Sequence, residues 1–87
     1  MTVFYQKKFL KDLANIPEVY RKRIEHFVFD EMITATRFSA LGAEKMEGYK
    51  NYFKIRFGDY RVGLLFENNT ITLQRVLHRK EIYRYFP

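Results

Sequence analysis

The stretch Tyr52–Val62, YFKIRFGDYRV, decides the fold, because it has the pattern of a β-hairpin with one apolar and one cationic face. Side chains alternate between the two faces of a strand, so the apolar residues of its first half share one face and the residues between them share the other. Glycine at the first position of Gly58-Asp59 favours a two-residue loop. This loop places Arg56 opposite Arg61 and continues the apolar face into the second strand.

The other face of this hairpin gathers positive charge, since Lys54, Arg56 and Arg61 all point to it. Like charges directly opposite each other destabilise a sheet, so the arrangement adds nothing to the stability of the fold. An anion held between the side chains explains it, and phosphate is the anion that arginine suits best. The alternative is an ordinary solvated strand face.

The preceding sequence supplies two helices and shorter elements. Val3–Tyr5 is a short β-prone run, and Gln6–Ala14 has apolar residues at helical spacing. Pro17 marks the start of a second helix, which forms a hairpin with the first. Thr34–Ala43 shows no periodicity and is predicted to be a loop, and Glu44–Glu47 is predicted to be a short strand.

A final strand follows a tight turn. Asn68-Asn69 signals this turn because asparagine tolerates positive φ, and Thr70–Leu77 then returns beside the hairpin. Strict alternation puts Arg75 on the apolar face opposite Val62, unless a bulge turns it away or it sits at the margin of the sheet. The order β-α-α-β-β-β-β predicts one α+β domain over residues 1–87: an N-terminal strand, a two-helix hairpin, and an antiparallel β-meander with the helices packed on one face.

Composition excludes several classes of protein. The chain of 87 residues has 16 lysines and arginines against 10 acidic residues, a net charge of +6 and a pI of about 9.7, which favours a polyanionic partner such as nucleic acid. The absence of cysteine excludes a disulfide scaffold and a thiolate metal site, and two histidines are too few to suggest a zinc centre. No apolar run reaches membrane-spanning length and no signal peptide is visible, so we expect a cytoplasmic protein without cofactor or metal.

The ordered set of elements and motifs resembles the RelE/ParE superfamily of toxins from bacterial and archaeal toxin–antitoxin systems. The similarity covers nearly the whole chain and is greatest from Glu44 to Tyr83. It rests on the element order, the turn at Gly48, the Tyr-Phe-Lys-Ile-Arg run, Asp59–Val62 (DYRV) and the closing His78–Tyr83 (HRKEIY). The chain resembles the RelE branch more than the ParE branch. Members of the RelE branch are ribosome-dependent mRNA endonucleases, whereas members of the ParE branch poison DNA gyrase.

The resemblance implies metal-independent cleavage of mRNA in the ribosomal A site. The 2′-hydroxyl of the substrate attacks the adjacent phosphate, leaving a 2′,3′-cyclic phosphate and a 5′-hydroxyl. The protein has to orient the RNA, stabilise the charge of the phosphorane, and move one proton from the nucleophile and another to the leaving oxygen.

By the same resemblance, four basic side chains and one tyrosine are candidate catalytic residues. Lys54 and Arg56 match two basic positions on the family's central strand, and Arg61 matches the arginine that holds the scissile phosphate. Arg79 lies near the family's late arginine, and Tyr83 matches a C-terminal tyrosine that stacks on the base or assists proton transfer.

The proton transfers involve further candidates. His78 is a candidate general acid because imidazole titrates near neutral pH, and Glu44 falls near a position where certain relatives carry a carboxylate base. Arg56 stands where others have lysine, and arginine does not deprotonate, so Lys54 is the better base of the two. The general base stays open between Lys54, Tyr83 and Glu44.

The resemblance also implies partners. These are the ribosome with its mRNA and a cognate antitoxin that wraps a partly helical segment around the toxin, with a heterotetramer as one candidate assembly; no membrane partner is expected. Such segments fold on binding and cover large surfaces. Phe29, Met32 and Ile33 lie off the main helical stripe and either form the docking surface or complete the core.

Other function classes stay open on sequence grounds. A ParE-like gyrase inhibitor would share the fold but give the basic cluster no catalytic duty. A non-catalytic nucleic-acid-binding module would show more aromatic side chains on the cationic face than Tyr52. A degenerate toxin would keep the fold for its regulatory complex alone. In these cases Tyr83 is a packing residue and His78 an ordinary surface residue at a strand end.

Overall fold

A five-stranded sheet of order β1-β5-β4-β3-β2 forms the centre of the molecule. The computed structural model describes residues 1–87. β1 pairs with β5 in parallel, and all other neighbours are antiparallel. The strands are β1 (Thr2–Tyr5), β2 (Glu44–Lys45), β3 (Tyr52–Phe57), β4 (Tyr60–Glu67) and β5 (Thr70–His78). The predicted α+β class and the closing meander are confirmed.

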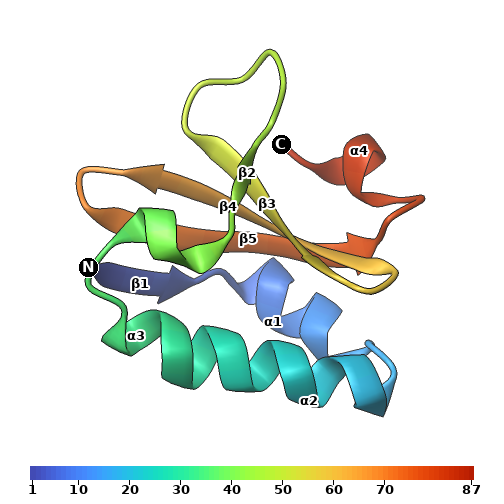
Figure 1. The fold of residues 1–87 in the computed structure, drawn as a ribbon. Helices are drawn as coiled ribbons and strands as arrows, with labels where there is room; N and C mark the ends of the chain where they lie inside the picture. Colours follow the sequence, from blue (N-terminus) through green and yellow to red (C-terminus); the bar gives the residue numbers. More distant parts are fainter.

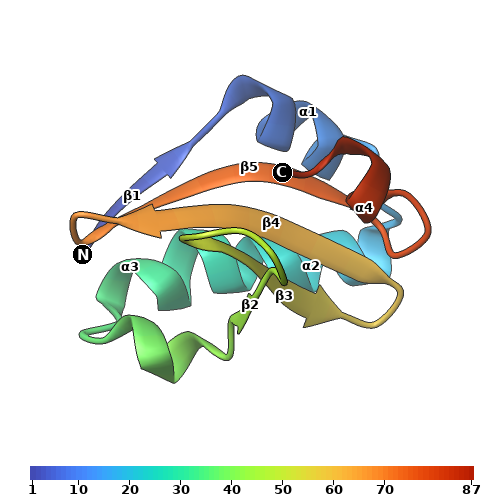
Figure 2. The same cartoon turned by 90° about the horizontal axis from the view of Figure 1, so that it is seen from above.

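The longer helices lie on one side of this sheet. Figure 1 shows α1 (Lys7–Ala14) and α2 (Glu18–His26) below the strands, with α4 (Ile82–Tyr85) and the loop between β2 and β3 above them. α2 continues through a π-helical turn, Phe27–Glu31, into α3 (Met32–Thr34). Figure 2 shows β1 beside β5 toward one edge of the sheet and β2 with β3 at the other. None of the helices is long and apolar enough to cross a membrane.

The core fills the space between the helical layer and the sheet. Phe9 of α1 and Ile24 of α2 are fully buried there and pack with the inward side chains of β3, β4 and β5. Ile55 and Phe57 are buried on this face, as their alternation predicts. The long helices and the apolar face of the hairpin therefore stabilise each other.

Truncating the central aromatic side chain of α1 should cost much of the stability. Phe9→Ala removes a side chain with no exposed surface, and we expect the free energy of unfolding to fall by about 3–5 kcal/mol. The matched control is Leu10→Ala, because Leu10 is the next residue of the same helix but is 42% exposed. Urea unfolding of both variants measures the difference. Equal losses for the two variants would contradict the burial of Phe9 in the core.

The register of the hairpin agrees with the sequence prediction. Arg56 lies opposite Arg61, and the two-residue loop between β3 and β4 contains Gly58 with a φ of 58°. The Cβ of any other residue at position 58 would lie 2.5 Å from the ring of Tyr20, so glycine is required by space as well as by conformation.

A bulge changes the register between β4 and β5. Leu64 pairs with Leu73, but Gly63 pairs with Arg75, so Gln74 has no partner across the ladder. Arg75 is therefore not opposite Val62, and the alternative in which a bulge turns it away is confirmed. The extra residue turns the arginine away from the core, as bulges commonly re-aim side chains.

Three other predicted elements need correction. Thr34–Ala43 is not only loop, because Phe38–Leu41 forms a 3-10 turn that stacks the ring of Phe38 on Phe66 at 3.9 Å. The strand predicted over Glu44–Glu47 is limited to β2. The tail after β5 forms α4, which the sequence pattern did not indicate because four residues show no periodicity.

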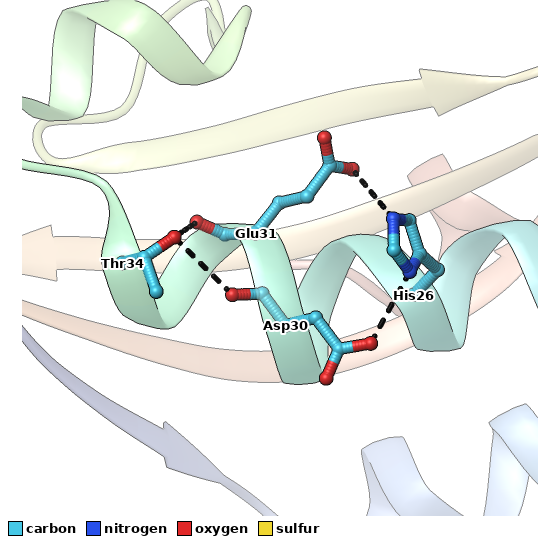
Figure 3. Close-up of polar contacts among 4 residues, drawn as sticks. All are labelled: His26, Asp30, Glu31 and Thr34. Atoms are coloured by element: carbon cyan, nitrogen blue, oxygen red, sulfur yellow. Dashed lines mark hydrogen bonds and ion pairs between the residues drawn. The ribbon is translucent and has the colours of Figure 1, made fainter.

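The π-helical turn also brings a histidine between two carboxylates (Figure 3). His26 Nδ1 lies 3.2 Å from Asp30 Oδ2, and Nε2 lies 4.0 Å from Glu31 Oε2. The hydroxyl of Thr34 donates to the backbone carbonyl of Glu31 at 3.1 Å. All four side chains are exposed, and no group of histidine and acidic residues in the molecule could hold a metal ion. We assign this cluster to the helix surface.

Of the three helix residues that the sequence suggests for antitoxin docking, two belong to the core and one is exposed. Met32 is fully buried and belongs to the core, and Phe29 packs its ring against Tyr5 at 5.0 Å. Only Ile33 is exposed, at 54%. The interpretation that these residues complete the core therefore holds for two of the three.

Candidate active site

The candidate site lies on the face of the sheet opposite the long helices. Lys54 and Arg56 alternate with buried residues along β3, and Arg61 lies directly opposite Arg56 on β4. Side chains in these positions point away from the core, as the sequence pattern predicts.

The short helix α4 covers part of this face. Ile82 and Phe86 are buried against Met46 and form a second, small apolar cluster with Tyr52 and Leu77 packed around it. These two anchors at the ends of α4 fix it on the sheet.

Glycine in β4 makes this docking possible. A Cβ at Gly63 would lie 2.6–2.7 Å from three ring carbons of Phe86, closer than any real contact. Glycine in the interior of a strand weakens the sheet, and one reason to keep it there is the close approach of another group. Here that group is the ring of Phe86.

α4 brings a tyrosine onto the central strand. Lys54 Nζ donates a hydrogen bond to the Tyr83 hydroxyl at 2.5 Å and lies 5.0 Å from the centre of the Tyr83 ring. Tyr83 is 61% exposed, so its side chain is accessible to a stacking partner. The two residues are distant in sequence and meet only through the fold.

A cleft of about 300 Å³ opens beside this pair. Its walls come from the loop after β2 and from the C-terminal segment. The lining residues are Met46, Glu47, Tyr49, Lys54, Tyr83, Phe86 and Pro87. The sequence alone does not indicate a role for Glu47 and Tyr49, because a single sequence gives no register for the loop that carries them.

A carboxylate shares the face with this pair. Glu44 of β2 is the register partner of Lys54, and residues directly opposite each other in an antiparallel pair point to the same side. The sheet therefore brings all three candidates for the general base, Lys54, Tyr83 and Glu44, to one face.

The arginines gather at the other end of the hairpin. Arg61 Nη1 donates to the carbonyl oxygens of Gly58 at 2.7 Å and Tyr60 at 3.0 Å, which directs its guanidinium to the β3–β4 turn. Arg79 reaches the same turn, where its Nε lies 3.6 Å from Asp59 Oδ1. Arg56 is exposed next to them. The cationic face thus has an arginine end and a lysine–tyrosine end.

His78 lies apart from this group. Its ring packs edge-on against Tyr60 at 5.4 Å, and its Nδ1 accepts a hydrogen bond from the Lys80 amide at 3.2 Å. Tyr60 in turn packs against Tyr20 of α2, which places His78 on the helical side of the sheet. The structure does not bring His78 together with Lys54 and Tyr83.

Comparison with known proteins identifies the family. Residues 3–83 match the family profile described as the ParE toxin of the type II toxin–antitoxin system, parDE. Over 89 aligned residues that span both chains completely, the sequence is 43% identical to toxin RelE3 of Methanocaldococcus jannaschii. The chain belongs to the ParE toxin family. Within this family it is a RelE-like toxin, so the predicted membership is confirmed.

Solved structures of RelE proteins have the same fold as this RelE-like toxin. The toxin of a RelB–RelE antitoxin–toxin complex from Methanococcus jannaschii is 41% identical, with a TM-score of 0.79 over 97% of this chain and 99% of that one. The isolated RelE toxin of E. coli is 15% identical, with a TM-score of 0.67 over 95% and 90% of the two chains. A toxin–antitoxin complex from Mycobacterium tuberculosis, RelBE2, gives 22% identity and a TM-score of 0.70 over 90% and 96%.

Proposed function

We propose that this RelE-like toxin is an mRNA endonuclease that acts on the ribosome. The observation that carries the proposal is the contact between Lys54 and Tyr83 in an open cleft, on the same face as Glu44 and two facing arginines. A base, a stacking ring and phosphate-binding cations are the parts that cleavage at a nucleotide needs.

The proposed reaction assigns a different step to each end of this face. The substrate 2′-hydroxyl loses its proton to a base at the lysine–tyrosine end and forms a bond to phosphorus. The bond from phosphorus to the 5′-oxygen breaks, and that oxygen takes up a proton. Lys54, Tyr83 and Glu44 can exchange protons here, whereas Arg56 and Arg61 carry fixed positive charge that stabilises the phosphorane.

The openness of the site favours dependence on the ribosome. Tyr83 and the loop that faces it are exposed, and no histidine lies beside Lys54 to complete an acid–base pair. Such a site gains rate when another surface holds the RNA in a reactive geometry. We propose that the decoding ribosome in the cytoplasm supplies this surface.

A cognate antitoxin completes the proposal. The relative from Methanococcus jannaschii was solved as an antitoxin–toxin complex with RelB. We propose that this chain binds a RelB-type antitoxin, with a heterotetramer as one candidate assembly, and that the antitoxin blocks the cationic face. A pull-down of the tagged toxin with its co-expressed neighbouring gene product tests the pairing.

Arg61→Ala tests the catalytic use of this face. We expect growth arrest on induction of the wild type, with new 5′ ends inside translated codons in primer extension, and loss of both in Arg61→Ala, because the guanidinium no longer binds the phosphate. The melting temperature should change little, since Arg61 lies outside the core. The matched control is Arg23→Ala at an exposed position of α2, and this variant should arrest growth like the wild type.

A second candidate function follows from the matched family profile, which describes ParE toxins. ParE-like inhibition of DNA gyrase needs the fold but no nuclease site. Growth arrest with DNA damage and without mRNA cuts, unchanged in Arg61→Ala, would favour this alternative and contradict the endonuclease proposal. No arrest by the wild type would favour a degenerate toxin or a plain binding module.

A further inference from the structure

A partly buried ion pair connects α1 to β5 at the edge of the sheet. Arg75 Nε lies 2.7 Å from Asp12 Oδ2, and Arg75 Nη2 lies 3.1 Å from Oδ1, so the contact has two parallel hydrogen bonds. Only 19% of the Arg75 side chain and 15% of the Asp12 side chain are exposed. The hydrogen bond to Asp12 raises the pKa of Arg75 further above its ordinary value. A pair of this geometry holds the guanidinium plane in one orientation.

The ion pair lies at the point where β1 ends and leaves the edge of β5 without a neighbouring strand. β1 pairs with β5 only as far as Leu73, so the next part of the β5 edge has no strand beside it. Asp12 fills this gap, because its Oδ2 also accepts the Val76 amide hydrogen bond at 3.2 Å. The bulge at Gln74 brings Arg75 to the same point.

Arg75 also reaches the helix that carries Tyr83. Its guanidinium carbon lies 5.7 Å from the centre of the Tyr85 ring in α4. Its register partner in β4 is Gly63, on which Phe86 rests. One arginine therefore contacts an acid below the sheet edge and an aromatic ring above the sheet.

We propose that Asp12 and Arg75 are positioning residues for Tyr83. Ile82 and Phe86 are two apolar anchors, and two anchors fix where a helix lies but not its rotation about the line that joins them. The contact between Arg75 and Tyr85 supplies the third point. It sets the rotation of α4 that presents the Tyr83 hydroxyl to Lys54, and Asp12 holds Arg75 in place for it. The inference rests on the proposed endonuclease function.

Tyr85→Ala tests this inference without disturbing the core, because Tyr85 is half exposed. We expect the melting temperature to stay within ~2 °C of the wild type. Amide exchange of Arg84 and Phe86, which donate to carbonyls of Glu81 and Ile82, should become about three- to ten-fold faster. The cleavage rate at saturating ribosomes should fall about ten-fold with an unchanged KM, since a misplaced group slows chemistry without weakening binding.

Tyr85→Phe is the conservative control. It keeps the ring over Arg75 and should restore both the exchange and the rate. In an Arg75→Ala background, where the cation is absent, Tyr85→Ala should add nothing to the amide exchange of α4. If Tyr85→Ala accelerated amide exchange as much in the Arg75→Ala background as in the wild type, the inference would be overturned.

The exchange measurement separates this inference from the proposed function. If the wild type cuts no mRNA, the endonuclease proposal fails, and the inferred role in catalysis fails with it. If the wild type cuts mRNA while Tyr85→Ala exchanges and cuts like the wild type, the positioning role is overturned and the function stands.

Discussion

Replacement of Lys54 by methionine should reduce mRNA cleavage by about 100-fold or more. Methionine keeps most of the length and apolar stem of lysine but cannot carry a proton or a positive charge, and a positioned acid or base contributes ~10²–10⁴-fold. The hydrogen bond from Lys54 to the Tyr83 hydroxyl is lost as well. Single-turnover cleavage of ribosome-bound mRNA measures the effect.

The control for this prediction is Lys22→Met. Lys22 is an exposed lysine of α2 whose ion pair with Glu18 lies on the helix surface, far from the cationic face in the fold. Its loss should leave cleavage unchanged, and neither variant should lose more than about 1 kcal/mol of stability. Cleavage by Lys54→Met at the wild-type rate would remove Lys54 from the catalytic group and leave Glu44 and Tyr83 as candidates.

Substitution of Gly63 by alanine should displace α4 and abolish cleavage. The new methyl group would overlap the ring of Phe86, so one of the two has to move. We expect a loss of about 1–3 kcal/mol in the free energy of unfolding, as for other overpacked sites. Cleavage should be lost because α4 carries Tyr83. Denaturant unfolding and the cleavage assay measure the two effects.

The test that isolates the cause is the same substitution in a Phe86→Ala background. There the added methyl group meets no ring, and alanine in a strand interior is better than glycine by roughly 0.5–1 kcal/mol. Gly63→Ala should therefore change from destabilising to neutral or stabilising. An equal loss in both backgrounds would show that the sheet, and not the docking of α4, requires glycine at this position.

The parts of the fold that follow from local rules could be predicted from the sequence. The two-residue loop and the alternation along Tyr52–Val62 fix the β3–β4 register without knowledge of the rest of the chain. The sequence left a bulge near Arg75 as one alternative but could not choose it, because Asp12, the partner of Arg75, lies on a helix near the start of the chain. Contacts of this kind leave no periodic signal.

Only the part of the candidate site that follows from strand alternation could be predicted from the sequence. Alternation placed Lys54, Arg56 and Arg61 on one face, but the contact between Lys54 and Tyr83 depends on α4. His78 shows that a residue adjacent in sequence to a candidate site residue can lie on the other face of the sheet. It is adjacent to Arg79, yet β5 continues far enough to turn its side chain to the helical face. One signal was present and not used, since glycine within a strand, as at Gly63, often marks the close approach of another group.

The parallel pairing of β1 with β5 has a consequence for synthesis of the toxin. Thr2 pairs with Thr70, and Lys54 meets Tyr83 only after the last strand is in place. During synthesis β1 has no partner until residues 70–73 have emerged from the ribosome, so the sheet cannot be completed before then. The cleft beside Lys54 and Tyr83 is therefore a late product of folding, because it needs strands and a short helix from both ends of the domain.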